Sequence, residues 1–147
     1  MLRRLRADNA TTETVVRLVT WHDKNIPRTR SGVARALGKL GERDLRRLLD
    51  VKWADNLAQA PEYRAVQGEI DKAEAILDQL LAESACVSLR QLAVSGRDLL
   101  ALGLSGPAVG RILRTLLDAV LDETLPNQRA ALLAAARNHK ESEERDP

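Results

Sequence analysis

The sequence predicts an all-α protein, a multi-helix bundle of about six to eight helices. Its 147 residues include two Trp, one Tyr and no Phe, so the core must consist of aliphatic side chains, which suit packed helices better than a β-sandwich. Apolar residues recur in steps of three and four along most of the chain, which is the period of a helix with one buried face. No stretch shows the alternation that is typical of a half-buried β-strand.

Three helices are predicted in the N-terminal part of the chain. Residues 9–12 offer N-caps for the first helix, and Pro27 lies in the loop that follows it. Ser31 is expected to cap the second helix and Gly41 to end it. The predicted spans are 9–21, 31–40 and 42–59.

The third predicted helix has an apolar stripe and a basic face. The stripe consists of Leu45, Leu48, Leu49 and Trp53. The basic face consists of Arg43, Arg46 and Arg47. Such a face can bind duplex RNA, because duplex RNA is recognised mainly through its shape, phosphates and 2′-hydroxyls. The alternative is an ordinary charged face that is partly neutralised by Asp44 and Asp50.

A long helix is predicted to begin at Pro61 and to end near Glu83. Its apolar residues follow one another in steps of three and four, which gives a nearly ideal seam for a partner helix. That partner can belong to the same chain or to a second copy, so a homodimer stays open. The seam consists of Tyr63, Val66, Ile70, Ala73, Leu77 and Leu80.

Shorter elements are predicted in the C-terminal part of the chain. Gly103 is expected to close the second of two short helical pieces, and Pro107 suits the first turn of the helix that follows. Asn127 is expected to cap the last helix. The predicted spans are 88–93, 95–102, 105–122 and 127–136. The charged run 140–147 has no apolar residue and is predicted to be disordered.

Charge is unevenly distributed along the chain. Residues 1–52 hold 13 Lys/Arg against 6 Asp/Glu, a net +7, and residues 53–147 hold 10 against 15, a net −5. A basic half attracts phosphate backbones through a sequence-independent field. The alternative is that these arginines lie on solvated helix faces. Cys86 is the only cysteine and no apolar run approaches the roughly 18 residues of a membrane span, so a cytoplasmic protein is the simplest expectation.

Two stretches of the chain resemble a known family. The first is Trp53-Ala54-Asp55-Asn56-Leu57-Ala58-Gln59. The second contains Ser88-Leu89-Arg90-Gln91-Leu92-Ala93-Val94-Ser95-Gly96-Arg97-Asp98-Leu99-Leu100, then Gly106-Pro107-Ala108-Val109-Gly110, then Leu125-Pro126-Asn127. Their order and spacing resemble the body and tail of bacterial CCA-adding tRNA nucleotidyltransferases. The segment Leu18-Val19-Thr20-Trp21-His22-Asp23 is similar to the end of the HD-like region that precedes that body.

The resemblance implies a division of the chain and a partner. Residues 1–85 would be an HD-like remnant and the body, residues 86–139 the helical tail, and residues 140–147 an acidic end. In that family a head domain transfers CMP and AMP to the 3′ end of tRNA, and the body and tail hold the acceptor arm and the elbow. The expected partners are therefore tRNA and a nucleotidyltransferase head domain, in cis or in trans.

The residues that nucleotide transfer requires are missing from the sequence. Metal-assisted transfer needs paired carboxylates, usually Asp-x-Asp on a strand, and a Gly-rich turn for the phosphates. The chain has no Asp-x-Asp and no Gly-Gly. We therefore predict no catalytic residue and no activity of this chain alone, although the parent protein can be an enzyme. Mg²⁺ and CTP or ATP are expected only for a head domain.

The tail motifs supply the remaining candidate RNA-binding residues. Free N–H groups at the start of the helix after Gly106 can bind a phosphate, and Gly110 would let a backbone come close. The alternative is that both glycines serve the turn and that Arg114 pairs with Asp118. The candidates are Arg90, Arg97, Gly106, Gly110, Arg111 and Arg114.

Two other classes of function stay open. His22-Asp23, with Asp55, indicates a degenerate HD-type phosphohydrolase, but such a site needs several His and Asp side chains from different helices. His139 is the only other histidine, so we predict no metal site. The second alternative is a stand-alone helical interaction or dimerisation module that uses the seam on the long helix.

Overall fold

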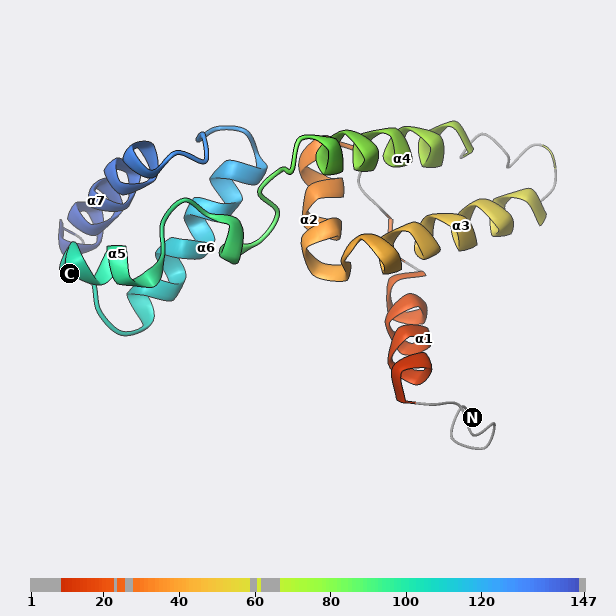
Figure 1. Cartoon of the computed structure of the whole chain (residues 1–147), viewed down its shortest axis with the longest axis horizontal. Coiled ribbons are helices and arrows are strands. Elements are labelled where there is room, and N and C mark those ends of the chain that lie inside the picture. The colour runs from red at the N-terminus through yellow and green to blue at the C-terminus, as the bar shows by residue number, and fades with distance from the viewer. Residues whose placement is uncertain (1–8, 23, 26–27, 59–60, 62–66, 146–147) are drawn as a thin grey trace. The chain divides into compact units, whose positions relative to one another are not determined.

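The computed structural model describes residues 9–22, 24–25, 28–58, 61 and 67–145, and its regular elements there are all helical (Figure 1). No β-strand occurs in those residues, which confirms the all-α prediction. The chain divides into two compact units, Met1–Glu83 and Ser84–Pro147. Among the described residues, every helix is too short or too polar to cross a bilayer.

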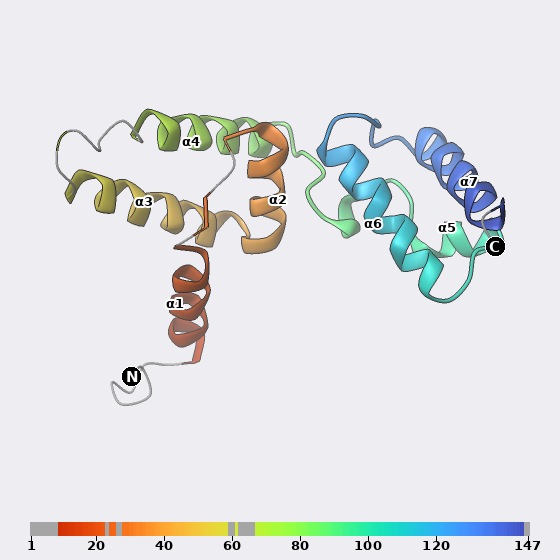
Figure 2. The ribbon, with the colours of Figure 1, turned by 180° about the vertical axis from the view of Figure 1, so that it is seen from behind.

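The first unit is organised around one central helix. Its helices are α1 (Asn9–His22), α2 (Arg30–Leu40), α3 (Glu42–Ala58) and α4 (Gln67–Ala82). Helix α3 packs against the other three, and α2 also packs against α4. Helices α3 and α4 run side by side in opposite directions (Figures 1 and 2).

The ends of α2 are set by one threonine and one glycine. Thr29 is the N-cap, and its hydroxyl accepts a hydrogen bond from the Gly32 amide at 3.2 Å. The prediction that Ser31 caps this helix was wrong, because the helix begins one residue before Ser31. Gly41 ends α2 with a φ of 76°, a conformation that a side chain disfavours, and its amide donates to the Leu37 carbonyl at 2.8 Å. The chain can therefore turn at once into α3.

The apolar seam of α4 is buried inside the first unit. Ile70, Ala73, Leu77 and Leu80 are all buried, on the helix that packs against α2 and α3. Tyr63 and Val66, the other members of the predicted seam, lie outside the described residues. The described part of the seam is therefore used within the chain.

The stripe on α3 is buried only in its first half. Leu45, Leu48 and Leu49 are fully buried, as predicted, but Trp53 is 43% exposed. The prediction that Trp53 belongs to the core stripe was wrong, since the described residues bury only Asn56 in the second half of α3. The apolar stripe in the sequence is therefore longer than the buried part of α3.

The second unit is built around α6. Its elements are the 3₁₀ helix η3 (Leu89–Gln91) and the α-helices α5 (Gly96–Ala101), α6 (Pro107–Leu121) and α7 (Arg129–Arg145). Helix α6 packs against η3, α5 and α7, and α5 also packs against α7. Its buried core consists of Leu92, Val94, Leu99, Leu104, Ile112, Leu116, Leu132 and Ala136.

Asn127 joins the end of η3 and the segment after it to the loop before α7. Its Oδ1 accepts from the Ala93 amide at 2.8 Å, and its Nδ2 donates to the Gln91 carbonyl at 2.9 Å. The prediction that Asn127 caps the last helix was wrong, because its side chain binds the segment after η3 instead. Helix α7 begins at Arg129, and the Leu132 amide donates to the Gln128 carbonyl.

Helix α7 continues to Arg145, past the residue where the sequence predicted disorder to begin. Lys140 provides a physical reason, since its Nζ donates to the Leu102 carbonyl at 3.1 Å, just after α5. A polar helical turn gains most of its stability from such tertiary contacts. Whether residues 140–147 form a disordered acidic end stays a prediction.

We predict that Leu77→Ala lowers the free energy of unfolding of the first unit by about 2–5 kcal/mol, because Leu77 is fully buried in the seam. Urea denaturation followed by circular dichroism at 222 nm measures the change. Gln79→Ala, an exposed change on the same helix, is the matched control and should shift stability by less than about 0.5 kcal/mol. Equal midpoints for the two variants would show that the seam is not packed within the chain.

Candidate nucleic-acid interface

The first turns of α5 and α6 meet in the second unit. A Cβ placed on Gly96, the first residue of α5, would lie 3.5 Å from Cγ1 of Val109 in the first turn of α6. Arg97 follows Gly96, and Gly110 and Arg111 follow Val109. The structure therefore brings together two segments that lie more than ten positions apart in the sequence, and each segment contains candidate residues.

Gly106 and Gly110 leave the start of α6 open. Gly106 is the N-cap of α6 with a φ of 55°, and a Cβ there would meet nothing within 4 Å. A Cβ on Gly110 would meet only the guanidinium Nη2 of Arg114, at 3.8 Å. The Arg114 guanidinium thus lies against Gly110, near the start of α6.

The arginines around these turns face solvent. Arg90, Arg97 and Arg114 are exposed, and none of them makes a hydrogen bond or an ion pair within the described residues. The Arg114–Asp118 pair that the sequence offered as an alternative is therefore not formed in that part of the chain. Arg111 is also exposed, and its carbonyl accepts from the Thr115 hydroxyl at 3.2 Å.

Asp98 is held by other groups and does not neutralise Arg97. Its carboxylate accepts from Nη2 of Arg129 at 2.6 Å, and from the amide and hydroxyl of Ser95 at 2.7 and 2.8 Å. The hydrogen bond from Arg129, followed by those from Ser95, holds the pKa of Asp98 well below its usual range. A cation in the first turn of a helix is mildly unfavourable, so an anion beside Arg97 would be stabilising.

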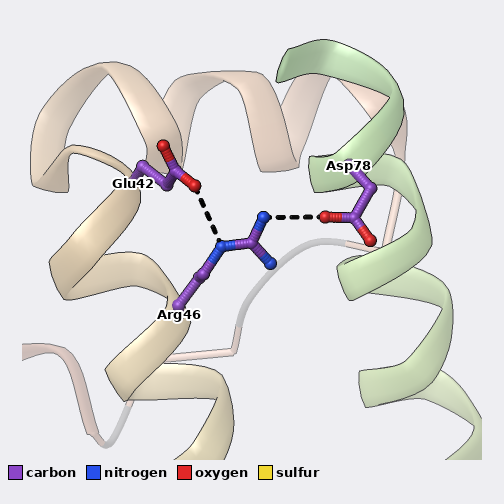
Figure 3. A network of polar contacts seen from close by, with 3 residues as sticks. All are labelled: Glu42, Arg46 and Asp78. Atoms are coloured by element: carbon purple, nitrogen blue, oxygen red, sulfur yellow. Dashed lines mark hydrogen bonds and ion pairs between the residues drawn. The ribbon is translucent and has the colours of Figure 1, made fainter. Parts of the chain in front are cut away.

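Arg46 links two helices of the first unit (Figure 3). Its Nε donates to Oε1 of Glu42 at 3.1 Å, and its Nη2 donates to Oδ1 of Asp78 at 2.8 Å, across to α4. The hydrogen bonds that Arg46 donates to Asp78 and to Glu42 raise the pKa of its guanidinium. Two carboxylates therefore neutralise the single positive charge of Arg46. The bond to Asp78 joins α3 to α4.

Arg43 and Arg47 lie on the side of α3 that faces α1. With Thr11, Thr14, Val15 and Leu18 of α1 they line a cleft of about 360 Å³. Arg17 of α1 reaches across to Asp44 of α3, with 3.0 Å between Nη1 and Oδ2. Asp44 is a buried carboxylate that the sequence analysis treated only as a surface charge. Asp44 lies in the first turn of α3, beside a run of arginines, and this position could have indicated a carboxylate with a structural ion pair.

Asp23 and Asp55 were the candidate metal ligands beside His22. Asp55 is exposed, and Asp23 lies outside the described residues. The described residues contain no group of three His, Cys, Asp or Glu side chains that could hold a metal ion. Cys86 packs against the core of the second unit, and burial raises the pKa of its thiol, so the thiol form is favoured.

The fold and these surfaces define an all-helical protein with exposed arginines on both units. A family model described as tRNA nucleotidyltransferase domain 2, putative, matches residues 1–136. The chain therefore belongs to this family. The comparisons with curated proteins and with solved structures gave no match.

We predict that Asp98→Asn destabilises the second unit at neutral pH by an amount that shrinks in acid. The folded pKa of Asp98 is lowered, so its stabilising effect is complete above the unfolded pKa of about 3.9 and disappears as the pH falls toward the folded value. Thermal unfolding at pH 7 and at steps below pH 4 measures the difference between variant and wild type.

Asp55→Asn is the matched control for that series. Asp55 is exposed and makes no ion pair within the described residues, so its substitution should change the melting temperature little at any of these pH values. A difference between Asp98→Asn and wild type that stays constant from neutral pH into acid would contradict the assigned role of the Asp98 carboxylate.

Proposed function

We propose that this chain is a non-catalytic, tRNA-binding part of a CCA-adding tRNA nucleotidyltransferase, and that it holds the acceptor arm and elbow of tRNA. Membership of the tRNA nucleotidyltransferase domain 2 family supports the choice of RNA partner. The observation that carries the proposal is the group of arginines beside the open first turns of α5 and α6. Nucleotide transfer then belongs to a head domain, in cis or in trans, which would hold Mg²⁺ and CTP or ATP.

The chemistry of the second unit suits a phosphate backbone. Guanidinium groups bind phosphate oxygens in pairs of parallel hydrogen bonds, and helix N-termini add free N–H donors. Arg97 and Arg114 bring charge to the two first turns, and Gly106 leaves the start of α6 uncovered. Asp98, the nearest carboxylate in sequence to Arg97, is occupied by Arg129. An RNA phosphate is therefore the anion that this surface lacks.

The first unit contributes a smaller surface in this proposal. Arg43 and Arg47 remain RNA-binding candidates, because they line a cleft and face solvent at least in part. Arg46 is left out, since both of its described partners are carboxylates of the chain itself. We also infer a cytoplasmic location, where tRNA is found.

We predict that the double substitution Arg111→Ala, Arg114→Ala weakens tRNA binding by at least about tenfold. A charged hydrogen bond contributes roughly 1.5–3 kcal/mol, and 1.4 kcal/mol corresponds to a factor of ten. The slope of log K against log salt should also fall by about two, because each arginine removed leaves one RNA phosphate without its neutralising cation. Fluorescence anisotropy of labelled tRNA, titrated at several salt concentrations, gives both quantities.

The control removes the same charge elsewhere. Arg28→Ala with Lys72→Ala deletes two cations that pair with Glu69 in the first unit, and tRNA affinity should stay within about twofold of wild type. If the wild-type chain does not bind tRNA at low salt, the proposed function fails. If both double variants weaken binding equally, the assignment to the start of α6 fails.

A further inference from the structure

The cleft between α1 and α3 has the size and lining of a small ligand site. Its volume of about 360 Å³ lies within the range of roughly 300–1,000 Å³ that is typical of ligand pockets. Two guanidinium groups, from Arg43 and Arg47, lie on the α3 side. Val15 and Leu18 supply apolar surface from α1, and no carboxylate belongs to the lining.

The charge around the cleft is positive and only partly balanced. Asp44 is the nearest described carboxylate that pairs with these arginines, and Arg17 holds one of its oxygens at 3.0 Å. Arg47 lies 4.0 Å from the other oxygen, beyond the length of a normal hydrogen bond. Arg43 makes no ion pair within the described residues. Among the described residues, one carboxylate thus serves two arginines, and none pairs with the guanidinium of Arg43.

A hydroxyl group faces the same space from α1. The hydroxyl of Thr20, on the same helix, donates a hydrogen bond to the Val16 carbonyl at 2.7 Å. Thr14 lines the cleft, and its hydroxyl makes no hydrogen bond within the described residues. A ligand with both an anionic group and sugar hydroxyls could therefore use the arginines and Thr14, while a flat ring packs on Val15 and Leu18.

We propose that this cleft binds one nucleotide of an RNA chain. The phosphodiester lies between the guanidinium groups of Arg43 and Arg47, the ribose faces Thr14, and the base contacts Val15 and Leu18. Arg17 and Asp44 act as positioning residues, because their ion pair ties α1 to α3 and so keeps the two walls together. This proposal rests on the proposed tRNA binding and assigns a single nucleotide to the surface of the first unit that contains Arg43 and Arg47.

A photo-crosslinking experiment tests the position directly. The full chain carries benzoylphenylalanine in place of Thr14 or, as a control, in place of Val19, which is on the same helix and 65% exposed but does not line the cleft. We expect labelled tRNA to cross-link at position 14 several times more efficiently than at position 19. Millimolar AMP should leave the cross-link unchanged, because a single nucleotide lacks the contacts of the whole RNA.

A charge substitution gives an independent measurement. Arg43→Gln should weaken tRNA binding about three- to tenfold and lower the salt slope by about one. Lys72→Gln, which removes the same charge from an exposed position on α4, should change affinity by less than about twofold. Circular dichroism melting verifies that both variants fold, as expected for exposed side chains.

The outcomes separate this proposal from the one on which it rests. If wild-type chain fails to bind tRNA, the proposed function falls, and the cleft proposal falls with it. If wild type binds, but position 14 cross-links no better than position 19 or Arg43→Gln matches Lys72→Gln, only the cleft proposal is overturned. Loss of the cross-link with AMP while tRNA stays bound would assign the cleft to free nucleotides and would also overturn it.

Discussion

The structure depends on packing aliphatic side chains around one central helix in each unit. With almost no aromatic residues available, the buried leucines of α3 and α6, together with Ile112, form the apolar surface of the central helix in each unit. Such cores are small, so polar contacts fix the ends of the elements. Asn127 ties the segment after η3 to the start of α7, and Lys140 ties α7 to the end of α5.

Ion pairs of three aspartates determine which arginines remain without a carboxylate partner in the described part of the chain. Asp98 pairs with Arg129 and accepts hydrogen bonds from Ser95. Asp44 pairs with Arg17, and Asp78 pairs with Arg46. Each of these carboxylates joins two helices, and Asp44 is shared, because Arg47 lies 4.0 Å from its other oxygen. Arg97 and Arg43, both in first turns of helices, are left without an ion pair in the described part of the chain. The basic surface is thus a consequence of which carboxylates the packing uses.

Helix positions could be predicted from the sequence because they follow from local periodicity, whereas the roles of polar side chains could not. The spacing of Ile70, Ala73, Leu77 and Leu80 predicted the buried face of α4 correctly. Asn127 suits a helix cap by its chemistry, but its actual partners are more than thirty residues away, and no local rule reveals them. Arg46 likewise looked like a free basic residue until α4 brought Asp78 next to it. The placement of RNA-binding residues stays a prediction, because binding itself is not part of the fold.

Recognition by such surfaces would depend on the shape of an RNA and not on its sequence. Arginines without base-reading neighbours bind phosphates, which every nucleotide carries, so specificity must come from the spacing of the contacts. Each proposed surface offers only a few arginines, and each contact alone is weak at physiological salt. Because both units belong to one chain, the second contact is intramolecular once the first has formed, and the combined affinity can exceed either one by orders of magnitude. An RNA whose phosphates can reach only one of the two surfaces would lack that gain. In this way a protein that reads no bases could still select one folded RNA.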